Sequence, residues 1–314
     1  MDNPKLTLRD LLTENNINGK RVVVFDSHHF ALLPWSDFAR ELGAPVRLLT
    51  LDYHTDTMMA FRGYLSQLEA DGDYDETFDF RDERRARLAL VDPSDEASLQ
   101  QAVTHLRYDE HIDAAIRLGV IETAFVICHD GAGLALESNE QLALWEAGKT
   151  KISVQGLDGE FEIEALGTGV ATGPFTYTLP EDRMVVLPER NVYSWSPRVG
   201  DEDRENRDAA LVSEFLAERL ALVDEICEST GLPKLFDKPF ILDIDLDYFN
   251  TKCSVEPADS TVFNELVRRA GLITIAREPG CVRSCQLPGE QLNAMQLETD
   301  LLRLIGNAMS TKPT

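Results

Sequence analysis

The strongest constraint on the fold is a series of short apolar segments separated by stretches long enough for helices. Five segments have the length and apolar content of buried strands: residues 22–25, 46–51, 124–128, 240–247 and 272–276. Apolar residues recur at helical spacing in residues 35–42, 111–118 and 208–226. Alternating strands and helices are typical of a mostly parallel sheet with helices on both faces. We therefore expect a three-layer α/β/α fold in one domain over residues 1–314.

Two regions depart from this alternation. Residues 151–166 read as two alternating strands around Leu157-Asp158-Gly159, which is a hairpin signal. With the Gly-rich stretch that follows, they predict a small antiparallel β insertion at about residues 151–185. Residues 71–87 are dense in charge, and we expect a surface loop or lid there.

The charge balance limits the classes of partner. The chain has 55 Asp and Glu against 30 Lys and Arg, which gives a formal net charge of −25. Nucleic-acid binding requires a basic surface, so we expect no nucleic-acid partner. An acidic cleft would instead concentrate metal ions or a cationic substrate. The same excess of acid is also explained by solubility alone.

Targeting signals and cysteines set the expected compartment. The N-terminal sequence MDNPKLTLRDLL lacks the plan of a signal peptide, and no apolar run approaches the length of a membrane helix. We expect a cytoplasmic protein with no membrane partner. The five Cys are an odd number, and Cys281 and Cys285 have no second Cys or His pair beside them in the sequence. We interpret them as ordinary reduced thiols.

A motif of carboxylates and histidine follows the apolar segment 46–51. Asp52, His54 and Asp56 occupy alternate positions, and side chains two apart on an extended chain point the same way. The three side chains should converge just beyond the end of the strand. Two carboxylates and an imidazole without a thiolate suit a hard or borderline divalent ion such as Mn²⁺. A polar turn with a capping Asp is the alternative.

A second acidic motif lies inside a later apolar segment. Asp243, Asp245 and Asp247 alternate with Ile and Leu. Three carboxylates on one face repel each other, and their burial is costly unless a cation compensates the charge. A metal ion is the simplest such cation. An exposed edge strand is the alternative, but the aromatic residues Tyr248 and Phe249 that follow argue against exposure.

A third element, His28-His29, follows the first apolar segment. Either imidazole could complete a metal site, and a core or surface role fits a lone pair of histidines equally well.

An early His, a strand-end Asp-x-His-x-Asp and a later Asp-x-Asp resemble the arginase (ureohydrolase) metal signature in order and spacing. That family binds two Mn ions in a three-layer α/β/α domain. The resemblance implies an arginase-like domain with two Mn ions, or other divalent metals. The ligands it implies are His28, Asp52, His54, Asp56, Asp245 and Asp247. His29 remains the alternative to His28, and the role of Asp243, which stands where the family has Ser, is open.

Four segments resemble a narrower branch of this fold that includes peptide arginases: residues 26–32, 110–116, 244–249 and 273–279. Peptide arginases convert Arg side chains of ribosomally made precursor peptides to ornithine and release urea. The resemblance therefore implies a hydrolase whose partner is an arginine-containing precursor peptide. Together the similar segments are spread over roughly residues 20–285.

Two further residues acquire roles from the same resemblance, and a third, His129, is suggested by its place after segment 124–128. Arginases place an acidic residue after the strand that corresponds to 272–276, where it pairs with the guanidinium, which implies that Glu278 binds and orients the substrate. They also place a proton-shuttling His where His111 begins an expected helix, which implies a catalytic role for His111. His129 could line the substrate-binding rim. The plain alternatives are a solvated loop Glu and two histidines that only pack.

Other functions of the same site stay open. A hydrolase of the same fold could act on a free guanidino compound such as arginine or agmatine, or could be an amide deacetylase. A peptide enzyme needs an open rim with no fixed anchor for the α-carboxylate and α-amine. A metal-binding regulator without catalysis would instead have a closed coordination sphere.

Overall fold

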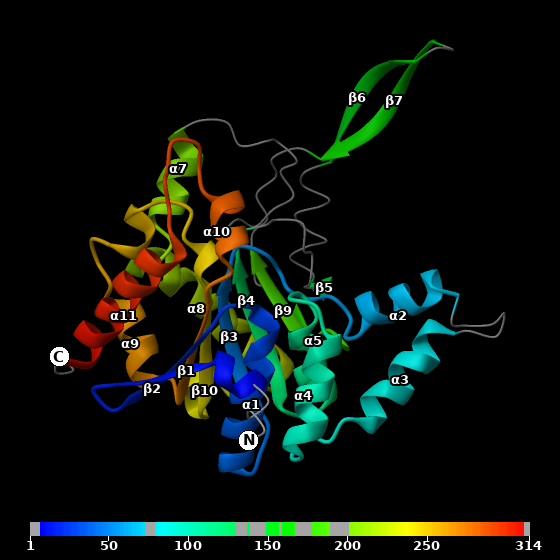
Figure 1. The fold of residues 1–314 in the computed structure, drawn as a ribbon. Coiled ribbons are helices and arrows are strands. Elements are labelled where there is room, and N and C mark those ends of the chain that lie inside the picture. The colour runs from blue at the N-terminus through cyan, green and yellow to red at the C-terminus, as the bar shows by residue number, and fades with distance from the viewer. Residues whose placement is uncertain are drawn as a thin grey trace, which may run out of the picture.

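The computed structural model describes residues 7–72, 79–129, 137–138, 149–156, 159–166, 177–188 and 201–310. A seven-stranded sheet lies at its centre in the order β1-β2-β11-β10-β3-β4-β9 (Figure 1). Its strands are β1 (Thr13–Ile17), β2 (Lys20–Phe25), β3 (Val46–Asp52), β4 (Ile121–Cys128), β9 (Met184–Pro188), β10 (Phe240–Asp245) and β11 (Leu272–Ala276). Only β1, against β2, is antiparallel among these described strands. The mostly parallel sheet expected from the sequence is confirmed.

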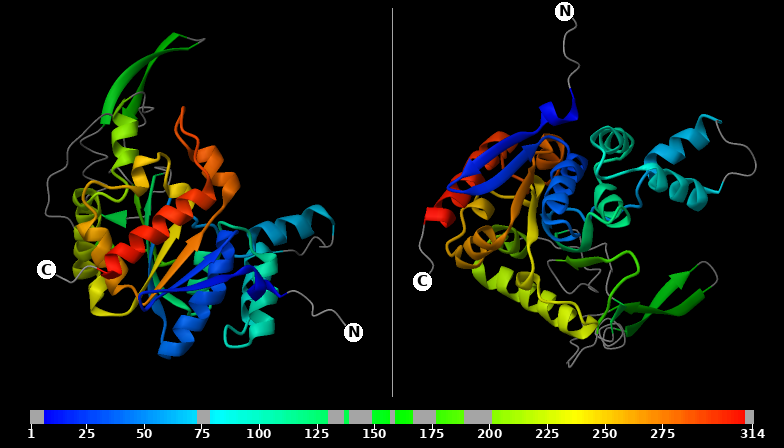
Figure 2. Two further views of the ribbon diagram at one scale, coloured as in Figure 1. Left: turned by 60° about the vertical axis from the view of Figure 1, so that its left-hand side comes forward. Right: turned by 90° about the horizontal axis from the view of Figure 1, so that it is seen from below.

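Helices cover both faces of this sheet (Figure 2). One face packs against α1 (Leu32–Leu42), α4 (Glu96–His105) and α5 (His111–Arg117). The other packs against α8 (Ser213–Thr230), α9 (Thr261–Arg269) and α11 (Ala294–Ser310). Successive residues of a strand feed the two cores alternately, so the central strands are apolar along their whole length. The three-layer α/β/α prediction is confirmed.

The remaining described elements are short or peripheral. The helices are α2 (Arg62–Ala70), α3 (Phe80–Leu90), α7 (Asp201–Asp208) and α10 (Pro279–Cys285). The 3-10 helices are η1 (Leu8–Leu11), η2 (His28–Ala31), η3 (Leu235–Asp237), η4 (Leu246–Tyr248) and η5 (Cys253–Val255). In the described ranges, no helix combines the length and apolar character needed to cross a bilayer.

The charged region 71–87 differs from the loop that we expected. Residues 73–78 lie outside the described residues, and Phe80 onwards forms α3. Asp79 caps this helix by accepting hydrogen bonds from the backbone N–H groups of Arg81 and Asp82. None of the residues of α3 is buried, so its charge reflects a solvated helix. The expected helix at 208–226 likewise begins later, at Ser213.

The predicted antiparallel hairpin is present as β6 (Lys149–Gly156) paired with β7 (Gly159–Leu166), while its turn residues 157–158 lie outside the described residues. A second small pair joins β5 (Glu137–Ser138) to β8 (Tyr177–Thr178). Near the expected end of the insertion, at about 185, β9 starts at Met184 and belongs to the main sheet. The Gly-rich residues 167–176 lie outside the described residues.

The strand order determines where polar side chains can meet. The parallel strands β2, β11, β10 and β3 are neighbours, so their carboxyl ends lie at one edge of the sheet. Asp245 pairs with Ala276, and Ala276 in turn pairs with Phe25. In open α/β sheets, ligands bind at this edge.

Candidate metal centre

The carboxyl ends of three strands deliver the predicted ligands to this edge. β2 leads into η2, which starts at His28; β3 ends at Asp52; and β10 ends at Asp245, just before η4. Each Asp at a strand end then makes a tight local turn. The Asp52 Oδ1 atom accepts a hydrogen bond from the His54 N–H at 2.7 Å, and Asp245 Oδ1 accepts one from the Asp247 N–H at 3.0 Å.

The first cluster consists of one imidazole facing three carboxylates. His28 Nδ1 lies 3.0 Å from Asp56 Oδ2, 3.2 Å from Asp245 Oδ2 and 3.4 Å from Asp52 Oδ2. All four side chains are buried. Asp56 reaches this point from a left-handed backbone conformation, with φ of 46°, which Asp tolerates better than most residues. The structure thus brings four of the predicted ligands together.

The second cluster lies beside the first, toward solvent. His54 Nδ1 lies 3.0 Å from Asp247 Oδ2 and 3.9 Å from Asp52 Oδ1. Asp52 therefore presents one carboxylate oxygen to each cluster. The side chain of His54 is 41% exposed, whereas the other predicted ligands are buried. The hydrogen bond with Asp247, followed by that with Cys285, raises the pKa of His54 to about 12.

Asp243 contacts the Nε2 side of the His28 ring, whereas the Nδ1 side faces the first cluster. Its Oδ2 atom lies 2.8 Å from His28 Nε2 and also accepts a hydrogen bond from the hydroxyl of Thr50 at 2.8 Å. Its Oδ1 atom accepts one from the hydroxyl of Thr274 at 2.5 Å. These contacts leave Asp243 outside the first cluster and fix the orientation of the imidazole.

His28, and not His29, points into the cluster. The His29 ring lies edge-on against Phe30, with ring centroids 4.7 Å apart. Burial, and then the neighbouring His28, lower the pKa of His29 to about 4. Among the alternatives left by the sequence, the geometry therefore favours His28 as the ligand.

The buried carboxylates need a compensating cation. Burial first, and then the neighbouring carboxylates, raise the pKa of Asp52 and Asp245 well above the ordinary range. Burial also raises the pKa of Asp56 to about 6. Among the described residues, histidine is the only basic side chain within ion-pair distance of Asp52, Asp56, Asp245 and Asp247.

Two buried atoms of the first cluster that have no hydrogen-bond partner among the described residues also indicate a site for a cation. His28 Nδ1 and Asp52 Oδ2 are buried without a hydrogen-bond partner among the described residues, although they face each other. Burial lowers the pKa of His28, but the carboxylates around it, Asp243 foremost, outweigh burial and hold that pKa well above its ordinary value. Oxygen and imidazole donors converging in this way could hold a metal ion.

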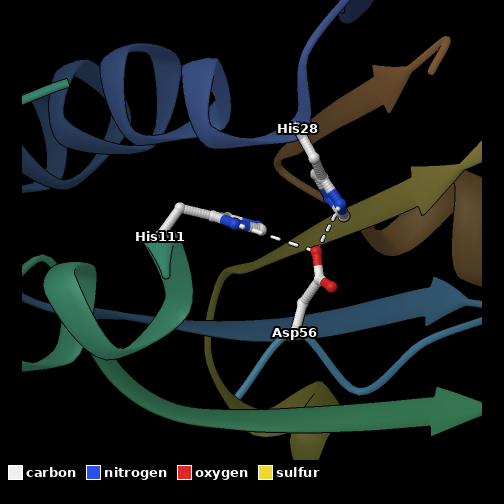
Figure 3. A group of neighbouring side chains, drawn as sticks. All are labelled: His28, Asp56 and His111. Atoms are coloured by element: carbon white, nitrogen blue, oxygen red, sulfur yellow. Dashed lines mark ion pairs between the residues drawn. The ribbon is translucent and has the colours of Figure 1, made fainter. Parts of the chain in front are cut away.

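His111 adjoins the first cluster from the start of α5. Figure 3 shows His28 and His111 approaching Asp56 from different elements. The His111 ring centroid lies 4.2 Å from that of His28, and His111 Nδ1 lies 3.9 Å from Asp56 Oδ2. Burial, then His28, lower the pKa of His111 well below its ordinary value, so the ring is neutral. His111 therefore lies directly beside two candidate ligands, His28 and Asp56.

Glu278 lies at the same edge, at the start of α10. Its backbone is left-handed, with φ of 34°, and its Oε1 atom accepts a hydrogen bond from the His28 N–H at 2.8 Å. Its Oε2 atom accepts one from the Cys281 thiol at 3.2 Å. The carboxylate is half-buried and adds to the negative charge that raises the pKa of Asp56 and Asp245.

His129, which we expected at the rim, has a buried side chain. Its side chain is 3% exposed, and its ring stacks on that of Tyr248 with centroids 4.4 Å apart. The Nε2 atom lies 3.0 Å from the backbone carbonyl oxygen of Tyr248. The backbone N–H of His129 donates to the carbonyl oxygen of Tyr53, next to Asp52, while its side chain packs on Tyr248.

Sequence reasoning missed Cys285. The last residue of α10 brings its Sγ atom to 3.9 Å from Asp247 Oδ2, beside His54. The sequence showed only two Cys four residues apart, and His54 is more than two hundred residues away in the chain. The only available signal was that Cys285 follows Glu278 by seven residues, which places it two helical turns further along.

A scan against models of known protein families and a search of curated proteins found no match for this chain. The fold and the buried His and Asp clusters are compatible with a metallohydrolase.

Proposed function

We propose that this protein is a metal-dependent hydrolase that converts arginine side chains of a precursor peptide to ornithine and urea. The observation that carries the proposal is the convergence of six carboxylate and imidazole side chains at one sheet edge, with Glu278 beside them. The residues suited to hold two Mn ions are His28, Asp52, Asp56 and Asp245 in the first cluster and His54 and Asp247 in the second. Bound divalent ions supply Lewis acidity and make water a strong nucleophile near neutral pH.

Glu278 has the chemistry to hold the substrate. Each of its carboxylate oxygens accepts one hydrogen bond within the protein, from the His28 N–H and the Cys281 thiol. An ionised carboxylate offers about four acceptor sites, so both oxygens can also accept from a guanidinium. Two parallel hydrogen bonds of this kind would orient the planar group next to the first cluster.

His111 has the chemistry to move a proton. Its Nδ1 atom lies 2.9 Å from the backbone carbonyl oxygen of Tyr108, and a carbonyl can only accept, so Nδ1 carries the hydrogen. The Nε2 atom is then the acceptor, and it is buried without a partner among the described residues. Hydrolysis breaks the bond between the guanidinium carbon and the side-chain nitrogen. The oxygen of water ends in urea, and the departing ornithine amine gains a proton that His111 Nε2 could relay.

Mass spectrometry of an arginine-containing peptide tests this function. After incubation with Mn-loaded protein, we expect a mass decrease corresponding to CH2N2 for each converted arginine, together with release of urea. The same peptide with lysine in place of arginine should be unchanged. Turnover of free arginine or agmatine without turnover of any arginine peptide would contradict the peptide substrate. Removal of acetyl groups from an acetyl-lysine peptide instead would contradict guanidinium hydrolysis.

Glu278→Gln tests the substrate-binding role. The variant should keep its bound metal while kcat/KM for the peptide falls roughly 10–100-fold, because the charged hydrogen-bond acceptor is lost. Glu265→Gln is a matched control, since Glu265 pairs with Arg269 on α9 and lies outside the candidate site. Equal activity of the Glu278 variant and the wild type would remove Glu278 from the proposal.

A further inference from the structure

We propose that Cys285 is a thiolate ligand of the second metal ion, so that the second site differs chemically from the first and selects a softer ion such as Zn²⁺. This inference rests on the metal centre of the proposed function and adds a ligand to it. The second cluster then offers one sulfur, one nitrogen and one oxygen, from Cys285, His54 and Asp247.

The three donor atoms already lie at a spacing that suits one ion. Cys285, His54 and Asp247 each place one ligand atom within 4.8 Å of those of the other two. His54 Nδ1 is 3.0 Å from Asp247 Oδ2, and Cys285 Sγ is 3.9 Å from the same oxygen. Donor atoms bound to a tetrahedral zinc ion are roughly 3.3–3.8 Å apart, as follows from bond lengths of about 2.0–2.3 Å. Small side-chain adjustments would complete the set.

The fold directs Cys285 toward this point. Glu278 starts α10 from a left-handed conformation, Pro279 follows at the first helical position, and α10 packs against η4, the element that contains Asp247. Cys281, one turn earlier on the same helix, points its thiol at Glu278 instead. Cys285 is thus the one of these two thiols that reaches the second cluster.

Donor chemistry distinguishes the two sites. The first cluster offers one imidazole and three carboxylates, a set that suits Mn²⁺. A thiolate favours softer ions, of which Zn²⁺ is the commonest in proteins with Cys and His ligands. On binding, the Cys285 thiol loses its proton to solvent and the sulfur forms the bond to the metal. The ratio of Zn²⁺ affinity to Mn²⁺ affinity should therefore be larger at the second site than at the first.

Cobalt substitution tests the assignment, because a thiolate bound to Co²⁺ produces a charge-transfer absorption in the near ultraviolet that carboxylate and imidazole do not. We expect this band in the wild type loaded with Co²⁺ under reducing conditions. It should persist in Cys281→Ser, the matched control, and disappear in Cys285→Ser. Affinity for Zn²⁺ should fall at least tenfold in Cys285→Ser and stay unchanged in Cys281→Ser.

Alkylation of the wild type gives a second readout that needs no variant. Bound Zn²⁺ should protect Cys285 from iodoacetamide, while the exposed Cys253 is modified with or without metal. Binding of Co²⁺ without a charge-transfer band, or equal labelling of Cys285 in both states, would overturn the ligand role and leave the proposed metal centre standing. A protein that binds no Co²⁺ at all would overturn both.

Discussion

Asp243 illustrates how a single buried carboxylate organises the site. In the sequence it is equivalent to Asp245 and Asp247, since all three alternate along one apolar segment. In the sheet, β10 pairs Asp243 with Thr50, one layer below the strand end, where its oxygens meet His28 and two threonine hydroxyls. Alternation predicted the motif, and the resemblance to arginases separated Asp245 and Asp247 from Asp243. The contacts that make Asp243 a positioning residue depend on register with the neighbouring strands.

Replacing Asp243 tests this positioning role. Asp243→Asn keeps the size of the side chain but weakens the hydrogen bond that orients His28, so we expect affinity for Mn²⁺ to fall roughly 10–100-fold. Titration calorimetry would measure the change. Thr274→Ser, which keeps the hydroxyl that donates to Asp243, is the control. Unaltered Mn²⁺ affinity in Asp243→Asn would contradict the role.

The carboxyl pKa values predict how metal binding depends on pH. The pKa of Asp56 is raised to about 6, chiefly by burial, and the pKa values of Asp52 and Asp245 are raised as well. Because a raised carboxyl pKa leaves the group protonated at mildly acidic pH, protons compete with the metal there. Affinity should rise through about pH 6, where Asp56 ionises, and continue to rise above it as Asp52 and Asp245 ionise, with release of protons on binding. A pH-independent affinity would contradict the raised values.

At the scale of elements, most strands could be predicted from their apolar content, and the other strands could not. The central strands lie within a few residues of the predicted segments because burial on both faces leaves a continuous apolar run. β9 was missed because it is a short edge strand of five residues that follows a Gly-rich stretch. The direction of α10, and with it Cys285, depends on the left-handed conformation of Glu278, which no local sequence rule predicts.

Two glycines test the packing of elements. A Cβ atom at Gly271, just before β11, would lie 2.3 Å from Cζ of the Phe38 ring on α1, whereas one at Gly306 in α11 would make an ordinary contact at 3.6 Å. Gly271→Ala should therefore destabilise the protein by about 1–3 kcal/mol through overpacking. Gly306→Ala should instead stabilise it by up to about 1 kcal/mol, because Ala favours helix. Denaturant unfolding measures both, and equal effects would contradict the packing of β11 on α1.

At the scale of the whole molecule, the candidate metal site concentrates part of a large negative charge. The formal net charge is −25. The four carboxylates of the two clusters are buried at one edge of the sheet. Among the described basic residues, only histidines lie within ion-pair distance of them. Repulsion between these groups opposes folding unless a cation is bound. The two apolar cores on either side of the sheet are independent of this edge, so the fold itself should persist without metal.

Metal removal should therefore lower stability without unfolding the chain. Chelator treatment should keep the far-ultraviolet circular dichroism spectrum and lower Tm. Mn²⁺ at a few hundred times Kd or more should restore roughly 3–4 kcal/mol of stability by mass action. Asp245→Asn, which removes a ligand charge from the first cluster, should lose most of this metal-dependent shift. A Tm that is the same with chelator, with Mn²⁺ and without either would contradict metal binding at this edge of the sheet.

Anomalous diffraction from crystals of chelator-treated protein, equilibrated with Mn²⁺ as the only divalent ion, tests the paired metal centre most directly. We expect two anomalous peaks at the carboxyl edge of the sheet. One should lie among His28, Asp56 and Asp245, and the other beside His54 and Asp247, with Asp52 between them. A single peak, peaks elsewhere on the molecule, or none at saturating Mn²⁺ would contradict the account.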